Sequence, residues 1–320
     1  MGIPRIVVRP RTLLYGGEEA SVERVGDGSI ITRFDKTPLP TKPTDVVCPH
    51  FLELKWATGC PYSCAWCYLQ GTLRFAPRKK RPYVKPYDKV EQHVRAFLSS
   101  VNGSGELLNA GELSDSLMYE RNGRPFSKFI LSLLQGQHRH KVLFVTKSDE
   151  VHHLLEVSGQ EHVVVSFSLN GHDVARTFEN GAPGVERRIE AGRRLNKAGY
   201  RVRIRIDPMV PVPDWQEQYS KLVDDIFSAF VPERITLGSL RGLQSTINNC
   251  PDRSWVDYLS EKSNWGRRVD KQIRQSMYGQ VIGQLRSQHG YSDVALCKET
   301  VEVWNALGMD YRQIKCNCIP

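Results

Sequence analysis

Residues 59–70 read GCPYSCAWCYLQ and bring Cys60, Cys64 and Cys67 together within one short stretch. A structural zinc site takes four ligands, usually from paired Cys-x2-Cys or Cys/His units, so three cysteines in one loop leave it incomplete. Three thiolates from a compact loop suit a [4Fe–4S] cluster, in which one iron stays open to another ligand. The spacing therefore predicts an iron–sulfur cluster with one open position.

Around this motif, β-rich runs alternate with helical stretches. The runs cover 51–57, 105–111, 141–147, 162–169, 201–208 and 234–240, and helices are expected near 88–101, 125–138, 150–157, 184–198 and 215–229. Such alternation predicts an α/β fold with βαβ crossovers and a parallel sheet. Six strands favour a barrel or an open barrel over a flat sheet, and residues 293–299 offer one further strand.

The run RVRIRID, 201–207, alternates strictly between apolar and polar residues, and 164–170 follows the same parity. The interior of a filled barrel is packed with branched apolar side chains. If helices cover the apolar faces here, the polar faces line a wet lumen that suits a polar ligand bound at the carboxyl ends of the strands. The alternative is that some of these are edge strands with a solvated face.

The chain divides into an N-terminal extension (1–47), a barrel core (48–240) and a C-terminal extension (241–320) that contributes an additional metal site or a lid. The 320 residues contain neither an apolar run of membrane-spanning length nor the apolar core of a signal peptide, which predicts a cytoplasmic protein with no membrane partner. In that compartment eight cysteines indicate metal or redox sites more than disulfides.

The net charge is +9, which favours a polyanionic partner. Residues 74–87, RFAPRKKRPYVKPY, interleave basic side chains with Phe75, Tyr83 and Tyr87 beside the cysteine loop. Cations neutralise phosphates and aromatic rings stack on bases, so this stretch predicts a groove for DNA or another nucleic acid. A solvated loop is the alternative.

Cys-x3-Cys-x2-Cys after the first strand, with Trp66 before the third cysteine, resembles the radical S-adenosylmethionine (SAM) superfamily. Across residues 57–240 the stretches CAWCYLQGTL, KRPYVKPY, SDSL, FVTKSDEV, VVSFSLNGHDVARTFENGAPGVERRIEAGRRLNKAGY and DPMVPVPDWQEQY are similar to the spore photoproduct lyase family. The resemblance implies a partial (β/α)6 TIM-type barrel, a [4Fe–4S] cluster and an external electron donor such as flavodoxin or ferredoxin. It also implies reductive cleavage of SAM to a 5′-deoxyadenosyl radical that abstracts hydrogen from a thymine dimer.

Carried over by position, the resemblance makes the three loop cysteines the cluster ligands. It makes a further set of residues candidates for binding SAM or relaying the radical: Trp66, Tyr68, Glu112, Ser114, Asp115, Lys147 and Ser168. An ammonium group suits the SAM carboxylate, hydroxyls suit its polar groups, and a phenol can relay a hydrogen atom.

Glu112 stands where the family has its hydrogen-donating cysteine, and a carboxylate cannot take over that role. Asp207 stands where the family has a small apolar residue, and Arg205 shares its face of the strand. We expect Glu112, Arg205 and Asp207, with Tyr68, to form the catalytic group and to hold a polar or zwitterionic group of the substrate.

Four cysteines lie in the C-terminal extension: Cys250, Cys297, Cys316 and Cys318. They are candidates for an auxiliary Fe–S cluster, although buried cysteines are also common as apolar fillers. One of these thiols is also a candidate to replace the missing hydrogen donor.

The sequence thus predicts a radical SAM enzyme, of lyase or isomerase type, that acts on a nucleic-acid base derived from thymine by repair, isomerisation or modification. A peptide or small metabolite is the alternative substrate. A nucleic-acid-binding protein with a structural Fe–S cluster is the alternative of another class, and it would have no use for Lys147 and Ser168.

Overall fold

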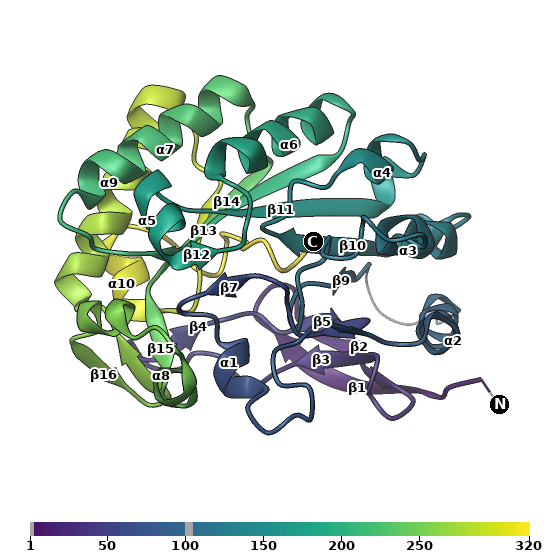
Figure 1. Cartoon of the computed structure of the whole chain (residues 1–320). Helices are drawn as coiled ribbons and strands as arrows, with labels where there is room; N and C mark the ends of the chain where they lie inside the picture. Colours follow the sequence, from purple (N-terminus) through teal and green to yellow (C-terminus); the bar gives the residue numbers. More distant parts are fainter. Residues whose placement is uncertain (1–2, 100–104) are drawn as a thin grey trace.

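The computed structural model describes residues 3–99 and 105–320, and its centre is a ten-stranded sheet (Figure 1). The strand order is β1-β2-β3-β5-β9-β10-β11-β13-β14-β18. Each neighbouring pair from β5 to β18 is parallel. These strands are β5 (Phe51–Leu54), β9 (Leu107–Asn109), β10 (Lys141–Thr146), β11 (Val163–Leu169), β13 (Arg201–Met209), β14 (Arg234–Ser239) and β18 (Val294–Leu296).

All six predicted strands are therefore present and parallel, and residues 294–296 add a seventh parallel strand. The connecting helices are α2 (Tyr87–Leu98), α3 (Phe126–Leu134), α4 (His152–Leu155), α5 (His172–Phe178), α6 (Val185–Lys197) and α7 (Trp215–Ala229). The helix expected near 88–101 ends at Leu98, and residues 100 and 101 of that expectation lie outside the described residues. The fold class is the α/β partial barrel that the sequence indicates.

Hydrophobic periodicity decides which faces the helices cover. The apolar side chains of β13, Val202, Ile204 and Ile206, are at most 1% exposed. In α6, Val185, Ile189 and Leu195 are buried at helical spacing, and α6 packs on β11 and β13. Full burial of each such side chain stabilises the fold by about 1.5–3 kcal/mol. The polar side chains of β13 are therefore left on the inner face of the curved sheet.

The N-terminal segment extends one edge of the same sheet. Strands β1 (Ile6–Leu13), β2 (Gly17–Val25) and β3 (Ile31–Phe34) are antiparallel, and β3 pairs with β5. Strand β4 (Val46–Val47) pairs with β19 (Glu299–Thr300) from the C-terminal segment. Both extensions thus contribute strands around the core, and their division at residues 47 and 240 stays a prediction.

The C-terminal segment carries a small sheet of its own. It is formed by β15 (Arg241–Leu243), β16 (Glu261–Ser263) and β17 (Gly266–Arg268), next to α8 (Gln244–Asn249) and the 3-10 helix Ser254–Tyr258. Helices α9 (Lys271–His289) and α10 (Val301–Ala306) follow. In the part of the chain that the structure describes, no helix is long and apolar enough to span a membrane.

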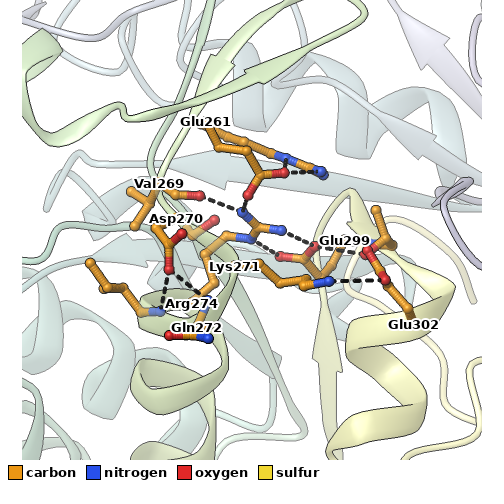
Figure 2. Close-up of polar contacts among 12 residues, drawn as sticks. Glu261, Val269, Asp270, Lys271, Gln272, Arg274, Glu299 and Glu302 are labelled. Atoms are coloured by element: carbon orange, nitrogen blue, oxygen red, sulfur yellow. Dashed lines mark hydrogen bonds and ion pairs between the residues drawn. The ribbon is translucent and has the colours of Figure 1, made fainter.

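A buried arginine fastens this segment to the barrel (Figure 2). Arg274 in α9 donates to Glu261 of β16 at 2.9 Å, to Glu299 of β19 at 3.0 Å and to the Val269 carbonyl. The Tyr278 hydroxyl donates to Glu299 at 3.1 Å and accepts the Ser239 N–H at 2.7 Å. This chain of contacts connects the C-terminal segment to the carboxyl end of β14.

The end of the chain lies inside the barrel, where Figure 1 places the C-terminus among the strands. Asn317 is fully buried and donates to Ser166 Oγ of β11 at 3.0 Å, while Thr236 of β14 donates to it at 2.8 Å. Arg203 of β13 donates to the carbonyls of Asn317 and Ile319. The polar faces thus line the interior as predicted, but at this level they bind the chain's own end.

Candidate functional site

The cysteine loop follows the first parallel strand, as the sequence predicts. It runs from β6 (Ala57–Thr58), which pairs with β8 (Tyr83–Val84), through β7 (Ser63–Cys64) to helix α1 (Leu69–Thr72). Gly59 has a φ of +80°, and a Cβ there would collide with the Lys80 and Arg81 carbonyls, so only glycine fits. Strand β7 pairs with β12 (Glu179–Asn180), which holds the loop on its other side.

The three loop thiols are free, with Cys64 buried and Cys60 and Cys67 partly exposed. Zinc bonds of about 2.3 Å would set tetrahedral thiolates about 3.8 Å apart. Within the described ranges these thiols do not form a group whose sulfur atoms all lie within 4.8 Å of one another. Three soft ligands from one loop suit a group of several irons in which one iron stays open.

Burial raises the pKa of Cys64 to about 12, and the Lys147 ammonium opposes that shift. Burial likewise raises the pKa of Cys67, against Lys80 and Lys147. These thiols are therefore protonated in the apoprotein at neutral pH. A bound metal centre would deprotonate them, because a coordinating thiol exists as thiolate.

Ser114, predicted to contact SAM, has a hydroxyl without a partner. Its side chain is buried, and its Oγ has no hydrogen bond to any described residue. A buried hydroxyl left unpaired costs about 1–3 kcal/mol. A polar group of a ligand bound beside the loop would satisfy it, so this position fits the SAM-binding role.

Asp115, another predicted SAM ligand, has a carboxylate that supports the backbone. Its carboxylate accepts hydrogen bonds from Thr146 Oγ1 at 2.7 Å, from the Lys147 N–H at 2.7 Å and from the Leu117 N–H at 3.0 Å. Burial raises its pKa, against these hydrogen bonds. Asp115 thus fixes the carboxyl end of β10 and, with it, the start of the Lys147 side chain.

Lys147 lies directly after β10 and pairs with a carboxylate that sequence reasoning missed. Its Nζ is 2.8 Å from Glu179 Oε1, and Arg188 Nη1 is 2.6 Å from Glu179 Oε2. Burial raises the pKa of Glu179, but the two cations outweigh it, and the pKa stays below its ordinary value. Two cations share one anion beside the cysteine loop, which leaves a net positive charge suited to a carboxylate ligand.

The remaining predicted cofactor residues surround this point. Trp66 is buried, and its ring lies 5.2 Å from that of Phe178, so it packs in the core. The Tyr68 hydroxyl donates to the Glu112 carbonyl. Ser168 is buried on β11, where it pairs in register with Arg205 of β13.

The expected charged group forms at the carboxyl end of β13, with one partner that sequence reasoning missed. Arg241, which follows β14, donates to both oxygens of Asp207 at 3.0 and 2.9 Å, while Arg205 lies 3.8 Å from Asp207. Burial raises the pKa of Asp207, but Arg241 and Arg205 lower it below its ordinary value. The position of Arg241 just past a strand end is the signal that would have identified it.

Glu112 faces the same group without a direct bond to it. Burial raises the pKa of its carboxyl, opposed by Lys298 and Arg205. Asp207 is committed to Arg241, so Arg205 and Glu112 are the members with capacity left for a ligand.

Three comparisons relate this site to known proteins. The family model for spore photoproduct lyase matches residues 50–238, which include the cysteine loop, Glu112, Lys147 and Asp207. The chain belongs to the spore photoproduct lyase family. A spore photoproduct lyase of Bacillus subtilis (strain 168) is 28% identical over 229 residues, covering 67% of this chain and 65% of that protein. One of Geobacillus sp. (strain Y412MC61) is 26% identical over 173 residues, covering 53% and 49%.

Solved structures of spore photoproduct lyase share the fold. One complexed with dinucleoside spore photoproduct has a TM-score of 0.64 at 18% identity, covering 82% of this chain and 78% of that chain. A double mutant with bound AdoMet and dinucleoside spore photoproduct has a TM-score of 0.60 at the same identity and coverage. The likeness confirms the α/β partial-barrel fold.

In this member of the spore photoproduct lyase family, the four C-terminal cysteines lie in two places: three lie near Arg205, and Cys250 lies at the end of α8. Arg205 lies 3.0 Å from Cys318 Sγ and 3.9 Å from Cys297 Sγ, and Cys316 interacts with Cys318. Cys250 instead caps α8 and donates to the Ile247 carbonyl at 3.5 Å. The structure brings three of the four predicted cysteines to the lumen and leaves Cys250 on α8.

Cys48, which the sequence analysis did not select, joins these thiols. It is buried and close enough to Cys316 and Cys318 for their charges to interact. Burial and the nearby Asp207 raise the pKa of Cys297 to about 12. The thiol is therefore protonated at neutral pH. Cys297 directly follows β18, which places this thiol at the carboxyl edge of the sheet.

The basic stretch 74–85 lies beside this site with its charge uncompensated. Phe75 is 85% exposed under the Arg74 guanidinium, and Arg78 covers the Tyr83 ring. Among residues 3–99 and 105–320 none of its six basic side chains forms an ion pair with a carboxylate: Arg74, Arg78, Lys79, Lys80, Arg81 and Lys85. Tyr87 differs from the expectation because it is buried, stacked on Phe129.

A basic cavity of about 660 Å³ lies in the small C-terminal sheet. Its lining includes Arg253, Lys262, Trp265 and Arg267. Helix α8, which contributes Gln244 and Ile247 to the lining, packs on α1. The two helices approach so closely that a Cβ added at Gly71 would lie 2.5 Å from the backbone nitrogen of Thr246. Two cationic surfaces that carry aromatic rings thus flank the cysteine loop.

The Asp207–Arg241 pair depends on the absence of a side chain at Gly238. A Cβ at that position would lie 2.5 Å from Asp207 Oδ1 and 3.1 Å from Arg241 Nη1. We expect Gly238→Ala to displace the pair and to lower stability by about 1–3 kcal/mol, measured by urea unfolding. Gly283→Ala is the matched control: a Cβ there meets nothing within 4 Å inside α9, so alanine should stabilise the helix. Equal effects of the two substitutions would contradict this account.

Proposed function

We propose that this chain is a radical SAM enzyme whose Cys60, Cys64 and Cys67 hold a [4Fe–4S] cluster, and that it abstracts hydrogen from a thymine-derived base in DNA. The observation that carries the proposal is the meeting of three features at the carboxyl ends of the strands. They are the loop of three free thiols, the net positive Lys147–Glu179–Arg188 group and the unpartnered Ser114 hydroxyl. When bound, the cluster and SAM supply a 5′-deoxyadenosyl radical, after one electron arrives from a flavodoxin or ferredoxin.

The residues around the loop then have separate tasks. Lys147 offers its ammonium to a carboxylate, and Glu179 holds that ammonium in place at 2.8 Å. Ser114 supplies a hydroxyl that nothing else in the described chain uses. Tyr68 holds its phenol against the Glu112 carbonyl, between the loop and the lumen, where a hydrogen-atom relay would be needed. A purely structural cluster would need none of these groups.

The lumen supports a substrate with an added polar group. Arg205 and Glu112 face the same space, and Arg241 fixes Asp207 beside them. Charged groups of both signs at the reacting end suit a base that carries a zwitterionic or polar substituent, which an unmodified thymine dimer lacks. Isomerisation, repair or further modification of such a base would use this arrangement, and the relatives are named as lyases of spore photoproduct.

A nucleic-acid substrate is supported by the two cationic surfaces that flank the loop. A relative has been solved with dinucleoside spore photoproduct. A base within a duplex would have to leave the stack to reach the lumen. Glu112 cannot donate a hydrogen atom, so we infer that Cys297, at the carboxyl end of β18, donates one to the substrate radical. The thiyl radical that remains on Cys297 would return to the thiol by taking one electron from the external flavodoxin or ferredoxin and one proton from solvent.

The test is an anaerobic reaction of the reconstituted enzyme with SAM, dithionite and DNA in deuterated water. We expect 5′-deoxyadenosine, together with DNA bases of altered mass, both measured by mass spectrometry after digestion. If Cys297 donates, deuterium enters the product from its exchangeable thiol, and Cys297→Ser loses that label while still forming 5′-deoxyadenosine. No 5′-deoxyadenosine would favour a binding protein with a structural cluster, and 5′-deoxyadenosine with unchanged DNA would favour a peptide or metabolite substrate.

A further inference from the structure

A second group of metal-ligating side chains lies at the opposite end of the sheet from the cysteine loop. His138, Glu161 and His162 each bring one ligand atom to within 4.8 Å of the other two. His162 ends the 3-10 helix Gln160–His162 just before β11, and His138 lies in the loop that precedes β10. Strands β10 and β11 are parallel neighbours, so the group lies at their amino ends.

The distances within this group match the needs of a single ion. Bonds of about 2.0–2.2 Å to nitrogen and oxygen place tetrahedral ligands about 3.3 Å apart. Glu161 Oε1 already lies 3.3 Å from His162 Nε2. The His138 and His162 rings lie 5.9 Å apart at 29°, and His138 is exposed, so its side chain is free to close the remaining gap.

Hydrogen bonds and packing around the group fix the loop that carries His138 and the ring of His162. Gln137 Oε1 accepts the N–H groups of Arg139 and His140 at 3.0 and 2.8 Å, which bends the loop around His138. The His162 side chain is only 5% exposed, and its Nε2 contacts the Glu161 carboxylate, so the packing around the ring fixes it beside the other two ligands. Glu161 is exposed and supplies the negative charge.

We propose that His138, Glu161 and His162 bind one divalent transition-metal ion, with water completing its coordination. Two imidazoles and one carboxylate suit Zn²⁺, Ni²⁺, Co²⁺ or Fe²⁺ and not the hard ions Mg²⁺ and Ca²⁺. The ion joins two loops that lead into neighbouring strands, so its role is to fasten the amino end of the sheet. It is independent of the cysteine loop and of the proposed reaction.

The experiment titrates Zn²⁺ into the cluster-reconstituted enzyme by calorimetry and repeats the titration with His138→Ala and Glu161→Gln. We expect the wild type to bind one Zn²⁺ per chain more than His138→Ala, and Glu161→Gln to bind that ion at least tenfold more weakly. The control His152→Ala removes another exposed histidine that lies beside a glutamate, and it should bind like the wild type.

Thermal unfolding with and without Zn²⁺ supplies a second readout, because an ion that binds only the folded state raises the Tm. This increment should be present in the wild type and His152→Ala and absent in His138→Ala. Equal stoichiometry and equal increments in wild type and His138→Ala would overturn the proposal and assign any bound zinc to thiols. Formation of 5′-deoxyadenosine by His138→Ala should be unchanged. The zinc titration and the Tm increment do not depend on SAM cleavage, so they test the metal site even if the proposed reaction does not occur.

Discussion

Replacing Glu179 with alanine should destabilise the protein by about 3–5 kcal/mol, the usual cost of removing one partner from a buried ion pair. Glu179 has a fully buried side chain that separates Lys147, 15% exposed, from Arg188, 1% exposed. Without it two cations face each other next to the cysteine loop. The expected fall in Tm is on the order of 10 °C, measured by thermal unfolding of the apoprotein, and SAM binding should weaken because Lys147 is no longer held.

Two variants separate the buried charge from general effects of losing a glutamate. Glu156→Ala removes an exposed carboxylate that pairs with Lys128 at 2.8 Å, and it should cost no more than about 1 kcal/mol. Glu179→Gln keeps the shape and removes the charge, so it should fall between Glu179→Ala and the wild type. A Tm for Glu179→Ala equal to that of Glu156→Ala would show that the buried group contributes little.

The same group gives the stability a pH dependence with a defined sign. The pKa of Glu179 in the folded protein lies below its ordinary value of 4.5, because Lys147 and Arg188 outweigh the effect of burial. Its stabilisation is therefore present in full above about pH 4.5 and is lost as the pH falls through the folded pKa. Glu179→Gln lacks this carboxyl group. The difference in free energy of unfolding between the wild type and Glu179→Gln, measured by urea unfolding at a series of pH values, should therefore shrink in acid.

The features that could be predicted from the sequence are those that local patterns encode. The parallel strands follow from apolar runs of strand length separated by amphipathic helices, and the cysteine loop follows from spacing alone. Strand ends place Lys147 and Asp207 at the same edge of the sheet, which the structure confirms geometrically.

The missed residues have partners far away in the sequence and no local pattern. Glu179 meets Lys147 across 32 positions, and Arg241 meets Asp207 across 34. The end of the chain in the lumen depends on Asn317 bonding to Ser166, 151 positions away. Asp115 stays a predicted cofactor residue, and the hydrogen bonds that its carboxylate accepts from the surrounding chain are a further role that the family motif does not reveal.

Alanine at Cys60, Cys64 or Cys67 should abolish both the cluster and SAM cleavage. Three thiolates bind three of the four irons of a [4Fe–4S] cluster and leave one open, whereas two thiolates leave two irons without a protein ligand and do not hold the cluster securely. We expect the reconstituted wild type to contain about four irons per chain, and each variant to contain nearly none and to form no 5′-deoxyadenosine above background. Colorimetric iron and sulfide assays and mass spectrometry measure the two quantities.

Cys250→Ala is the matched control, because among the residues that the structure describes its thiol bonds only to the Ile247 carbonyl of α8. It should keep its iron and its SAM cleavage, at the modest stability cost of a small buried side chain. About eight irons per chain in the wild type would reveal an auxiliary cluster. Because Cys318 lies beside Arg205, Cys318→Ala should then remove half of the irons. Cys250→Ala should remove none of them. A loop variant that kept its iron and its SAM cleavage would remove the basis of the proposed chemistry, because Lys147 and Ser114 would then surround a loop that binds nothing essential.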